Sequence, residues 1–342
     1  MKLRMFAISA ALPALLAAPA ASAANDRLSI LCSADMEWCQ MMKSRFQVES
    51  KIKVSMIRKS AGEAYAKIRA EAANPKTDIW WAGTGDTHLQ AASEGLTEVY
   101  KSPALAQQHP WAQRQAAAGG YRTTGIYLGV MGMAYNDKLL KARNIAPPAC
   151  WKDLAKPAFK GEVEMANPNS SGAAYNALAT FVQLFGEDAA FAFLAQMGKN
   201  VSKYPNAGVA PGEDVGRGEA GVAIGFMHDL MKLNVAGLPV KIVAPCEGTG
   251  YEIGSMSIVK GAKNMAAARQ FYEFALRPDT QGAAVTALAF QVPSHVKAAI
   301  PPNAPRLDNV KTIDFDFVKY GAPETRRRLL QRWTTTIYGA GR

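Results

Sequence analysis

The sequence N-P-N-S-S-G-A-A-Y, Asn167–Tyr175, joins a strand-like run to a long helical pattern. Its Pro-interrupted turn carries the hydroxyls of Ser170 and Ser171, followed by Gly172. Backbone N–H groups and hydroxyls gathered at a helix N-terminus favour an anion, because the helix dipole is positive there. The alternative is that Ser170 or Ser171 only caps the helix. The turn therefore predicts a strand–turn–helix unit and a candidate anion site.

Strand-like and helical patterns alternate in the residues that precede this turn. Short apolar runs are typical of strands, and longer stretches with apolar residues on one face are typical of helices. Strands that alternate with helices of about ten or more residues indicate an α/β fold with a mostly parallel sheet. The expected strands are Leu28–Cys32, Ile52–Ile57 and Asp78–Ala82, and the expected helices are Glu37–Glu49 and Gly62–Ala73.

Two long extended runs, Gly125–Tyr135 and Gly250–Val259, lie far apart in the sequence. They predict a pair of crossover strands between two α/β lobes. Ligands of such sheets bind at the carboxyl ends of the strands, so we expect the ligand between the lobes, where hinge closure buries it. The predicted boundaries are 24–126 and 252–312 for lobe 1 and 127–251 for lobe 2, with the helices of 313–342 assigned to neither.

The first residues have the pattern of an export signal. Lys2 and Arg4 precede the apolar run Met5–Ala18, and an Ala-Ser-Ala cleavage sequence ends at Ala23. This pattern predicts a secretory signal peptide over residues 1–23, cleaved after Ala23. The apolar run is short for a membrane-spanning helix, which needs about 20 residues. We expect an exported protein, located in the periplasm if the source is Gram-negative.

Four cysteines follow the signal peptide, and four cysteines allow three pairings. An oxidising compartment favours disulfides. Cys32 ends a strand-like run and Cys39 lies in the next helical pattern, so a local bridge between them is sterically reasonable. Cys150 and Cys246 would then pair by elimination. The alternative is that both pairs are free buried thiols.

The chain is basic, with a formal net charge of +11. Export and the absence of clustered basic and aromatic residues argue against a nucleic-acid partner. The run Arg326–Arg328 is typical of a solvated helix face. The sign of the charge fits a small anionic solute, or an acidic membrane surface nearby, better, although net charge alone establishes neither.

Two further turns resemble the one at Asn167–Tyr175 in their donors. Arg58–Gly62 follows a strand and opens a helix with Ser60, and Gly83–Gly85 follows another strand with Thr84 at its centre. Glycine lets a ligand approach the backbone closely, and each hydroxyl donates one hydrogen bond. Three such turns on two lobes would surround one phosphate, although Ser60 and Thr84 fit helix capping equally well.

At this point the chain resembles a known family over essentially its whole mature length. It is similar to the periplasmic solute-binding proteins of ABC importers, type II, extracellular solute-binding family 1, in the group named for ferric iron. The order and spacing of several segments carry the resemblance. These segments are Cys150–Leu154, Pro157, Lys160–Val163, Asn167–Tyr175, Arg217–Glu219, Val222–Gly225, Glu252–Lys263 and Ala266–Leu276.

The ferric members of this family bind iron largely through an adjacent pair of tyrosines. This chain has no Tyr-Tyr pair, and the matching position reads Phe-Met-His-Asp, Phe226–Asp229. The resemblance is closer to the branch that binds hexose phosphates, with related members that bind phosphonates. It implies a binding protein with no metal and no cofactor, in which hydroxyl-rich turns bind the phosphate and His228, Asp229 and Glu252 bind sugar hydroxyls.

The residues support such a sugar clamp in their own right. His228 and Asp229 follow the strand-like run Gly221–Phe226 at its carboxyl end, and Glu252 lies in the second long extended run. Carboxylates accept hydrogen bonds from neighbouring hydroxyls. The alternatives are a buried structural histidine, a helix cap at Asp229 and an inter-lobe ion pair at Glu252. Trp81 is a candidate platform for a sugar ring, and Glu37 is a candidate cleft residue that fits the first turn of its helix equally well.

Enzyme signatures are missing from the sequence. It contains no G-x-S-x-G, no H-E-x-x-H, no P-loop and no complete dinucleotide fingerprint. We therefore predict a monomeric periplasmic component of an ABC importer, which captures a small phosphorylated solute by hinge closure and delivers it to an inner-membrane permease. The alternatives are a ferric-iron or iron-chelate binder, a periplasmic ligand sensor and an enzyme that acts on phosphate esters.

Overall fold

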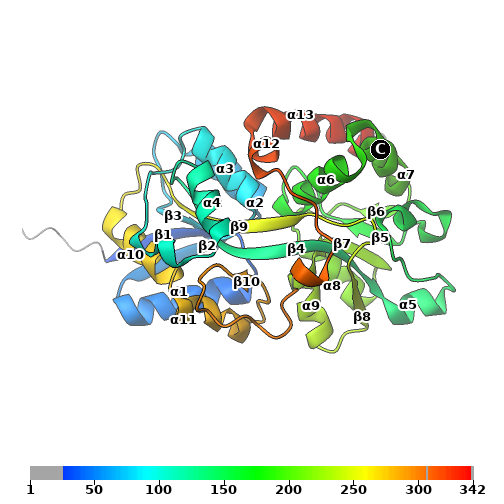
Figure 1. Ribbon diagram of the computed structural model, residues 1–342, viewed down its shortest axis with the longest axis horizontal. Coiled ribbons are helices and arrows are strands. Elements are labelled where there is room, and N and C mark those ends of the chain that lie inside the picture. The colour runs from blue at the N-terminus through cyan, green and yellow to red at the C-terminus, as the bar shows by residue number, and fades with distance from the viewer. Residues whose placement is uncertain (1–25, 306, 340–342) are drawn as a thin grey trace, which may run out of the picture.

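Two long strands cross the molecule and join its two halves (Figure 1). They are β4 (Thr124–Asn136) and β9 (Tyr251–Ile258), and the first half of β4 pairs antiparallel with β9. The computed structural model describes residues 26–305 and 307–339. The predicted signal peptide and its cleavage after Ala23 lie outside the described residues. The predicted α/β architecture with paired crossover strands is confirmed.

The half that contains the first three strands is called the first lobe here. Its strands β1, β2 and β3 are parallel and lie in the order β2-β1-β3, followed by β9 and β4. Helices pack on both faces of this sheet (Figure 1). The strands are β1 (Arg27–Cys32), β2 (Lys53–Arg58), β3 (Ile79–Trp81) and the short β10 (Val292–Pro293); the helices are α1 (Met36–Ser50), α2 (Ala61–Ala70), α3 (Gly85–Ser93), α4 (Pro110–Ala118), α10 (Met265–Ala275) and α11 (Pro278–Gly282), with 3₁₀ turns η1 (Pro103–Gln107) and η4 (Ala283–Ala287).

The other half is called the second lobe. The far part of β4 leaves β9 and pairs with β7 on one side and β8 on the other, so one strand belongs to both sheets. The order continues β4-β7-β5-β6. The strands are β5 (Val163–Met165), β6 (Val201–Lys203), β7 (Val222–Phe226) and β8 (Val240–Val243); the helices are α5 (Asp137–Ala142), α6 (Gly172–Phe185), α7 (Glu187–Gly198), α8 (Ala210–Arg217) and α9 (Met227–Val235), with 3₁₀ turns η2 (Trp151–Ala155) and η3 (Pro157–Phe159).

The C-terminal segment contacts both lobes. After the 3₁₀ turn η5 (Leu307–Asn309) come α12 (Phe317–Gly321), α13 (Pro323–Trp333) and a π-helical turn, η6 (Thr334–Tyr338). Leu329 and Trp333 of α13 are buried in the core of the second lobe. Arg326 of the same helix forms a buried ion pair with Asp86 at the start of α3 in the first lobe.

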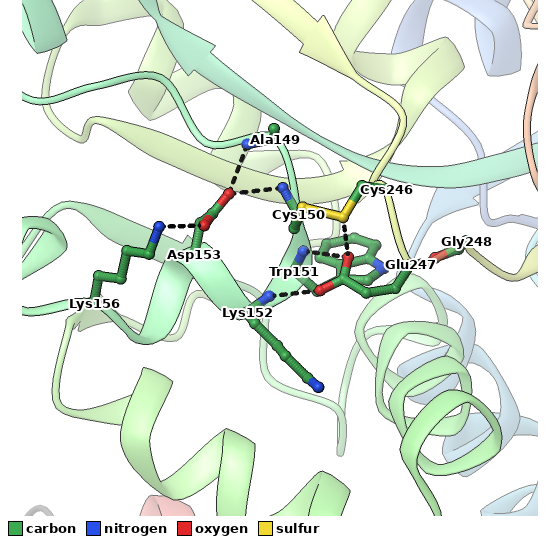
Figure 2. Close-up of a disulfide and its surroundings, with 9 residues drawn as sticks. All are labelled: Ala149, Cys150, Trp151, Lys152, Asp153, Lys156, Cys246, Glu247 and Gly248. Atoms are coloured by element: carbon green, nitrogen blue, oxygen red, sulfur yellow. Dashed lines mark hydrogen bonds and ion pairs between the residues drawn. A yellow bond between two sulfur atoms is a disulfide. The ribbon is translucent and has the colours of Figure 1, made fainter.

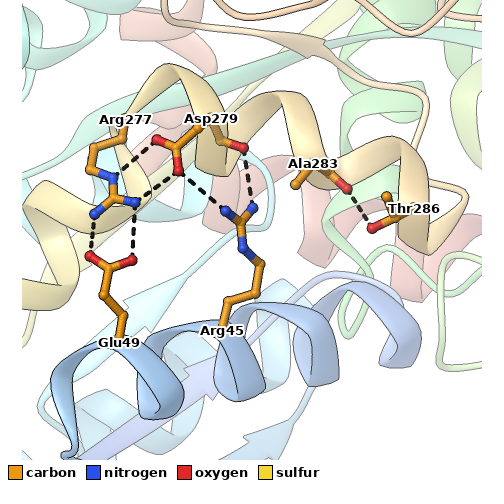
Figure 3. Close-up of polar contacts among 6 residues, drawn as sticks. All are labelled: Arg45, Glu49, Arg277, Asp279, Ala283 and Thr286. Carbon is orange, nitrogen blue, oxygen red and sulfur yellow. Dashed lines mark hydrogen bonds and ion pairs between the residues drawn. The ribbon is translucent and has the colours of Figure 1, made fainter.

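A network of charged side chains connects α1 to α11 on the first lobe (Figure 3). Arg45 lies 3.2 Å from the Asp279 carboxylate, and Arg277 donates to both Glu49 and Asp279. These four residues are partly or largely exposed. Exposed pairs contribute about 0.2–1 kcal/mol each to the free energy of unfolding, so the network aligns the helices more than it stabilises the fold.

Both predicted disulfides are present. Cys32 is bonded to Cys39, and Cys150 to Cys246. Figure 2 shows the second bond beside Glu247, whose carboxylate accepts hydrogen bonds from the backbone N–H groups of Trp151 (2.8 Å) and Lys152 (3.0 Å). The disulfide and these bonds hold the segment that leads into β9 against η2.

None of the helices within 26–305 and 307–339 is both long enough and apolar enough to cross a membrane.

Candidate functional site

A cavity lies where the two lobes meet. The first residues of α2 and α3 reach it from the first lobe, and those of α6 and α9 reach it from the second. Each of these ends presents backbone N–H groups and the positive end of a helix dipole. Seven of the ten predicted ligand-binding residues line the cavity: Ser60, Thr84, Ser171, Gly172, His228, Asp229 and Glu252.

Two predicted hydroxyls reach the cavity from the first lobe. Ser60 and Thr84 are the N-cap residues of α2 and α3, and both are buried. The Ser60 amide donates to the Glu63 carboxylate at 3.1 Å. The preceding Gly83 has a φ of +95°, which a residue with a side chain rarely adopts. The turn therefore needs glycine to bring Thr84 to the cavity.

The turn at Asn167–Tyr175 supplies the matching wall from the second lobe. The Ser171 hydroxyl accepts a hydrogen bond from the Ala174 amide at 3.2 Å, so it caps α6 and also lines the cavity. Gly172 approaches the first lobe so closely that a Cβ there would lie 2.2 Å from Thr84 Oγ1. The turn at Asn167–Tyr175 and the turn that carries Thr84 therefore lie opposite one another in the cavity wall.

Ser170 does not line the cavity. Its hydroxyl lies within hydrogen-bond distance of the carbonyl oxygens of Asn167 (3.2 Å) and Asn206 (3.0 Å), and its one proton serves one or the other. Its own carbonyl accepts from the amide of Gly62 in the first lobe at 3.1 Å. Ser170 thus joins the lobes through its backbone, and its hydroxyl is used within the second lobe.

Arg58 supplies the cationic group of the cavity wall. It ends β2, and its Nε donates to the Ala34 carbonyl at 3.2 Å. Its two terminal guanidinium nitrogens have no hydrogen bond to any described residue. A guanidinium with free N–H groups, next to hydroxyls and helix N-termini, suits a phosphate or another oxyanion.

His228, Asp229 and Glu252 form a second polar group in the cavity wall. His228 Nε2 lies 3.3 Å from Asp229 Oδ1 and 3.7 Å from Glu252 Oε1. The His228 ring stacks on Phe226, with centroids 5.3 Å apart. α9 begins at Met227 with Phe226 as its N-cap residue, so Asp229 lies in the first turn and the predicted alternative of a helix cap at Asp229 is wrong.

Burial controls the charges of this group. It lowers the pKa of His228 to about 3, so the imidazole is neutral at pH 7. It raises the pKa of Glu252 well above the ordinary value, and the nearby Asp229 carboxylate adds to the effect. The pKa of Asp229 is also raised, by burial first and by Asp35 second. Burial therefore favours the neutral forms of these three groups, each of which can hydrogen-bond to a ligand.

Tyr127, Asp35 and Gln291 also line the cavity, although their sequence context gave no sign of it. Tyr127 lies on β4, and its hydroxyl accepts a long hydrogen bond from the Gly83 amide at 3.3 Å. Its O–H has no acceptor among the described residues, so it can donate to a ligand. Tyr127 reaches the cavity because of how β4 pairs with its neighbouring strands, and no local sequence pattern reveals that pairing.

Glu37 and Trp81 lie outside the cavity wall. Glu37 is exposed and accepts a hydrogen bond from Lys232 of the second lobe at 2.8 Å. Trp81 is buried and packs edge-to-face on Trp38, with ring centroids 5.0 Å apart. A strand residue that points into the core cannot serve as a sugar platform, so the geometry gives Trp81 a packing role.

The described cavity wall contains one tyrosine, Tyr127, and not the adjacent tyrosine pair expected of a ferric-iron binder. Within the described residues, the one cluster of three or more His, Cys, Asp or Glu ligand atoms close enough to share an ion is Cys150, Cys246 and Glu247, whose cysteines are joined in a disulfide. The cavity instead combines hydroxyl, guanidinium and backbone donors with neutral acceptors. Such a set binds a polar organic anion by hydrogen bonds and requires no covalent step.

Comparisons with known proteins agree with this geometry. A family model of bacterial extracellular solute-binding proteins matches residues 74–320. The structure is similar to the periplasmic binding protein AfuA from Actinobacillus pleuropneumoniae with fructose-6-phosphate bound, with a TM-score of 0.89 and 42% identity over 91% of this chain and 98% of that chain. It is also similar to the periplasmic binding protein P5PA, with a TM-score of 0.88 and 34% identity over 91% of this chain and 99% of that one.

A more distant relative is the putative 2-aminoethylphosphonate-binding periplasmic protein of Salmonella paratyphi A, 28% identical over 79% of this chain and 77% of its own length. These relatives are binding proteins and not enzymes. The chain belongs to the bacterial extracellular solute-binding protein family, and it is a periplasmic-type binding protein whose relatives deliver small solutes to a membrane permease.

Proposed function

We propose that this protein binds a sugar phosphate or a closely related organophosphate between its lobes. The observation that carries the proposal is the pairing of two different walls in one cavity. Arg58 and the hydroxyls of Ser60, Thr84 and Ser171 form a donor-rich wall, and the neutral His228 group forms the other. A phosphate ester of a polyol matches both walls: its phosphate suits the donor-rich wall, and its hydroxyls suit the His228 group.

The charges favour a phosphate as the ligand's anionic end. Phosphate oxygens accept hydrogen bonds from guanidinium, hydroxyl and backbone N–H groups. Most of the donors on this wall are neutral, which suits a site that must release its ligand. The fructose-6-phosphate bound to AfuA and the phosphonate in the name of the Salmonella relative support the same class.

The proposed mechanism is closure of two lobes around the solute. We propose residues 24–126 and 252–312 as the first lobe and 127–251 as the second, connected by β4 and β9. Contacts between the lobes at the cavity rim, such as the bond from the Gly62 amide to the Ser170 carbonyl, favour the closed arrangement. We further propose export with cleavage after Ala23, a monomeric state and delivery of the solute to an ABC permease in the inner membrane.

A panel of ligands tests the proposal by isothermal titration calorimetry and thermal shift. The panel contains fructose 6-phosphate, glucose 6-phosphate, 2-aminoethylphosphonate, inorganic phosphate, unphosphorylated fructose and ferric citrate. We expect the hexose phosphates to bind most tightly; a hundredfold excess over Kd would stabilise the protein by about 2.7 kcal/mol. Binding of ferric citrate alone would replace the proposal with iron uptake, and turnover of a phosphate ester would show an enzyme.

Substitutions on the two walls should have different effects. Ser60→Ala with Thr84→Ala should weaken hexose phosphate and inorganic phosphate alike, by about tenfold or more, because each lost hydrogen bond to a charged group contributes about 1.5–3 kcal/mol. Asp229→Asn should weaken hexose phosphates and leave inorganic phosphate unchanged. If the double variant and Asp229→Asn each weakened hexose phosphate and inorganic phosphate equally, the phosphate and the sugar would not bind at separate walls.

A further inference from the structure

Three residues, two of them on strands and one just before a strand, form a row across the floor of the cavity. Gly129 of β4 pairs with Glu252 of β9. On its other side, β10 pairs antiparallel with β4, with Val292 opposite Leu128. Gln291, one residue before Val292, therefore lies beside Gly129. Directly paired residues of neighbouring strands point to the same face of a sheet, so Gln291 and Glu252 flank Gly129 on the cavity side. We call Gln291, Gly129 and Glu252 the floor row.

The glycine in the middle of this row makes room for a histidine. A Cβ on Gly129 would lie 2.3 Å from His228 Cε1 and 2.5 Å from His228 Nδ1. It would also lie 3.1 Å from Glu252 Oε1. The His228 ring therefore occupies the space that a side chain at position 129 would fill. Gly129 therefore lets a side chain of the second lobe lie over the floor row, close to Glu252.

Each polar residue of this arrangement has a buried atom without a partner in the described part of the chain. The atoms are Gln291 Oε1, His228 Nδ1 and Glu252 Oε2. Their residues are 8%, 3% and 2% exposed. Neither amide atom of Gln291 makes a hydrogen bond to a described residue. Buried polar groups are normally paired, because leaving one unpaired is unfavourable. Three unpaired atoms in one cavity wall point to a ligand that pairs with them.

The chemistry of these atoms restricts that ligand. His228 is neutral and carries one proton, and its Nε2 faces the carboxyl groups of Asp229 and Glu252. A hydroxyl satisfies Nδ1 in either tautomer, because it can donate to a bare nitrogen and accept from an N–H. Gln291 offers one acceptor and a donor amide. Hydroxyl groups satisfy both residues because they donate and accept, whereas a carboxylate only accepts and gives no donor to Gln291 Oε1.

We propose that Gln291 is a ligand-binding residue and that the floor row, with His228, selects phosphate esters whose distal end carries at least two free hydroxyls over those that end in a carboxylate. This inference rests on the proposed function. It adds a residue from a short segment before β10, outside the strand-end turns, and it states which organophosphates the cavity rejects.

Calorimetry on the unmodified protein gives the first test. Glycerol 3-phosphate and 3-phosphoglycerate differ at the end that would reach the floor row, since the first has two hydroxyls and the second has one hydroxyl and a carboxylate. We expect glycerol 3-phosphate to bind at least tenfold more tightly. Equal affinities, or tighter binding of 3-phosphoglycerate, would overturn the inference. If the protein binds no phosphate ester at all, the proposed function fails and the inference fails with it.

Variants give the second test. Gln291→Leu keeps the size of the side chain and removes both amide groups. We expect fructose 6-phosphate to bind at least tenfold more weakly, inorganic phosphate to bind as before, and the preference for glycerol 3-phosphate over 3-phosphoglycerate to shrink. Gln113→Leu, on α4 and outside the cavity wall, is the matched control and should change none of these affinities. Unchanged binding of fructose 6-phosphate by Gln291→Leu would overturn the role of Gln291. If that variant does not fold, Gln291→Ala is measured with the same expectations.

Discussion

Gly172 shows how a single absent side chain can decide whether the two lobes close. It is the first residue of α6, and a Cβ at this position would lie 2.2 Å from Thr84 Oγ1 and 3.0 Å from the Ala61 Cβ of the opposite lobe. The first turn of a helix accepts alanine readily. The conflict therefore exists only when the lobes are together, and an open form would accommodate the added methyl group.

We expect Gly172→Ala to weaken solute binding by about tenfold or more while leaving the unfolding temperature of the ligand-free protein nearly unchanged. The reason is that the variant raises the free energy of the closed form by about 1.4 kcal/mol or more, which is a factor of ten in affinity. Calorimetry and thermal unfolding measure the two quantities. Gly198→Ala, in α7, is the control, because its added Cβ meets its neighbours at 3.4 Å or more. Unchanged affinity in Gly172→Ala would contradict the close approach.

Glu252 gives the site a measurable pH dependence. Because its pKa is raised in the folded protein, the folded state holds a proton that the unfolded state releases above the ordinary pKa of 4.5. This residue therefore lowers stability as pH rises, by about 1.4 kcal/mol per pH unit until the folded-state pKa is passed.

Glu252→Gln should consequently gain stability relative to the original protein as pH rises from 5 to 8. Denaturant unfolding of both proteins across this range measures the difference. His88 and His228, whose pKa values are lowered by burial, titrate in both proteins and largely cancel in the comparison. A difference that does not change with pH would mean that Glu252 is ionised in the folded state.

At the scale of elements, α13 is connected to the first lobe by one buried ion pair. Arg326 and Asp86 are 4% and 3% exposed, and the guanidinium also lies over the Tyr175 ring at 3.8 Å. Two neighbours on the same helix, Arg328 and Arg332, instead reach the exposed start of α7. α13 thus contacts the second lobe through surface ion pairs and the first lobe through a buried ion pair.

Arg326→Leu should destabilise the protein by about 3–5 kcal/mol, because it leaves the Asp86 carboxylate buried without its partner. Arg328→Leu should cost less than about 1 kcal/mol, because that pair is largely exposed. Urea unfolding distinguishes the two. Adding Asp86→Asn to Arg326→Leu should recover part of the loss, and no recovery would mean that packing on Tyr175 is the main contribution of Arg326.

Elements and their order were predictable from the sequence, and side-chain direction was not. The alternating strands and helices, both crossover strands and the disulfide partners follow from local periodicity, turns and cysteine positions. The hydroxyls of Ser60, Thr84 and Ser171 were found because strand-end turns are local features. Tyr127 and Gln291 were missed because their place at the cavity depends on pairing between segments far apart in the chain. Ser170 and Trp81 point away from the cavity, since one position along a turn or strand reverses a side chain.

At the scale of the whole molecule, closure is assisted by charges at the cavity rim. Lys232 of α9 lies 2.8 Å from Glu37 and 3.3 Å from Asp35, both at the start of α1 in the other lobe. Its amine therefore connects the lobes without contacting the cavity floor. Glu37, predicted as a ligand contact, is better placed to affect binding through closure.

We expect Lys232→Met to weaken solute binding by about two- to fivefold, since a partly exposed pair contributes about 0.2–1 kcal/mol. The binding constant of the variant should also depend less on salt between 0.05 and 0.5 M NaCl. Calorimetry at both salt concentrations measures the effects, and small-angle scattering should show a larger open population. Lys199→Met is the control, because among the residues that the structure describes the Lys199 amine hydrogen-bonds only to Gln196, in the same lobe. Identical salt dependence in both variants would argue against a role for Lys232 in closure.

The bond between Cys150 and Cys246 spans 96 positions of the sequence. It turns most of the second lobe into a covalent ring, from which only the two crossing strands lead to the rest of the molecule. A protease that cuts once within this ring cannot release a fragment, because the pieces stay tied at the disulfide. Outside the cytoplasm, where proteases are present and chaperones that use ATP are not, a nicked molecule of this kind would keep its parts together, and a gel run before and after reduction would show one band becoming two.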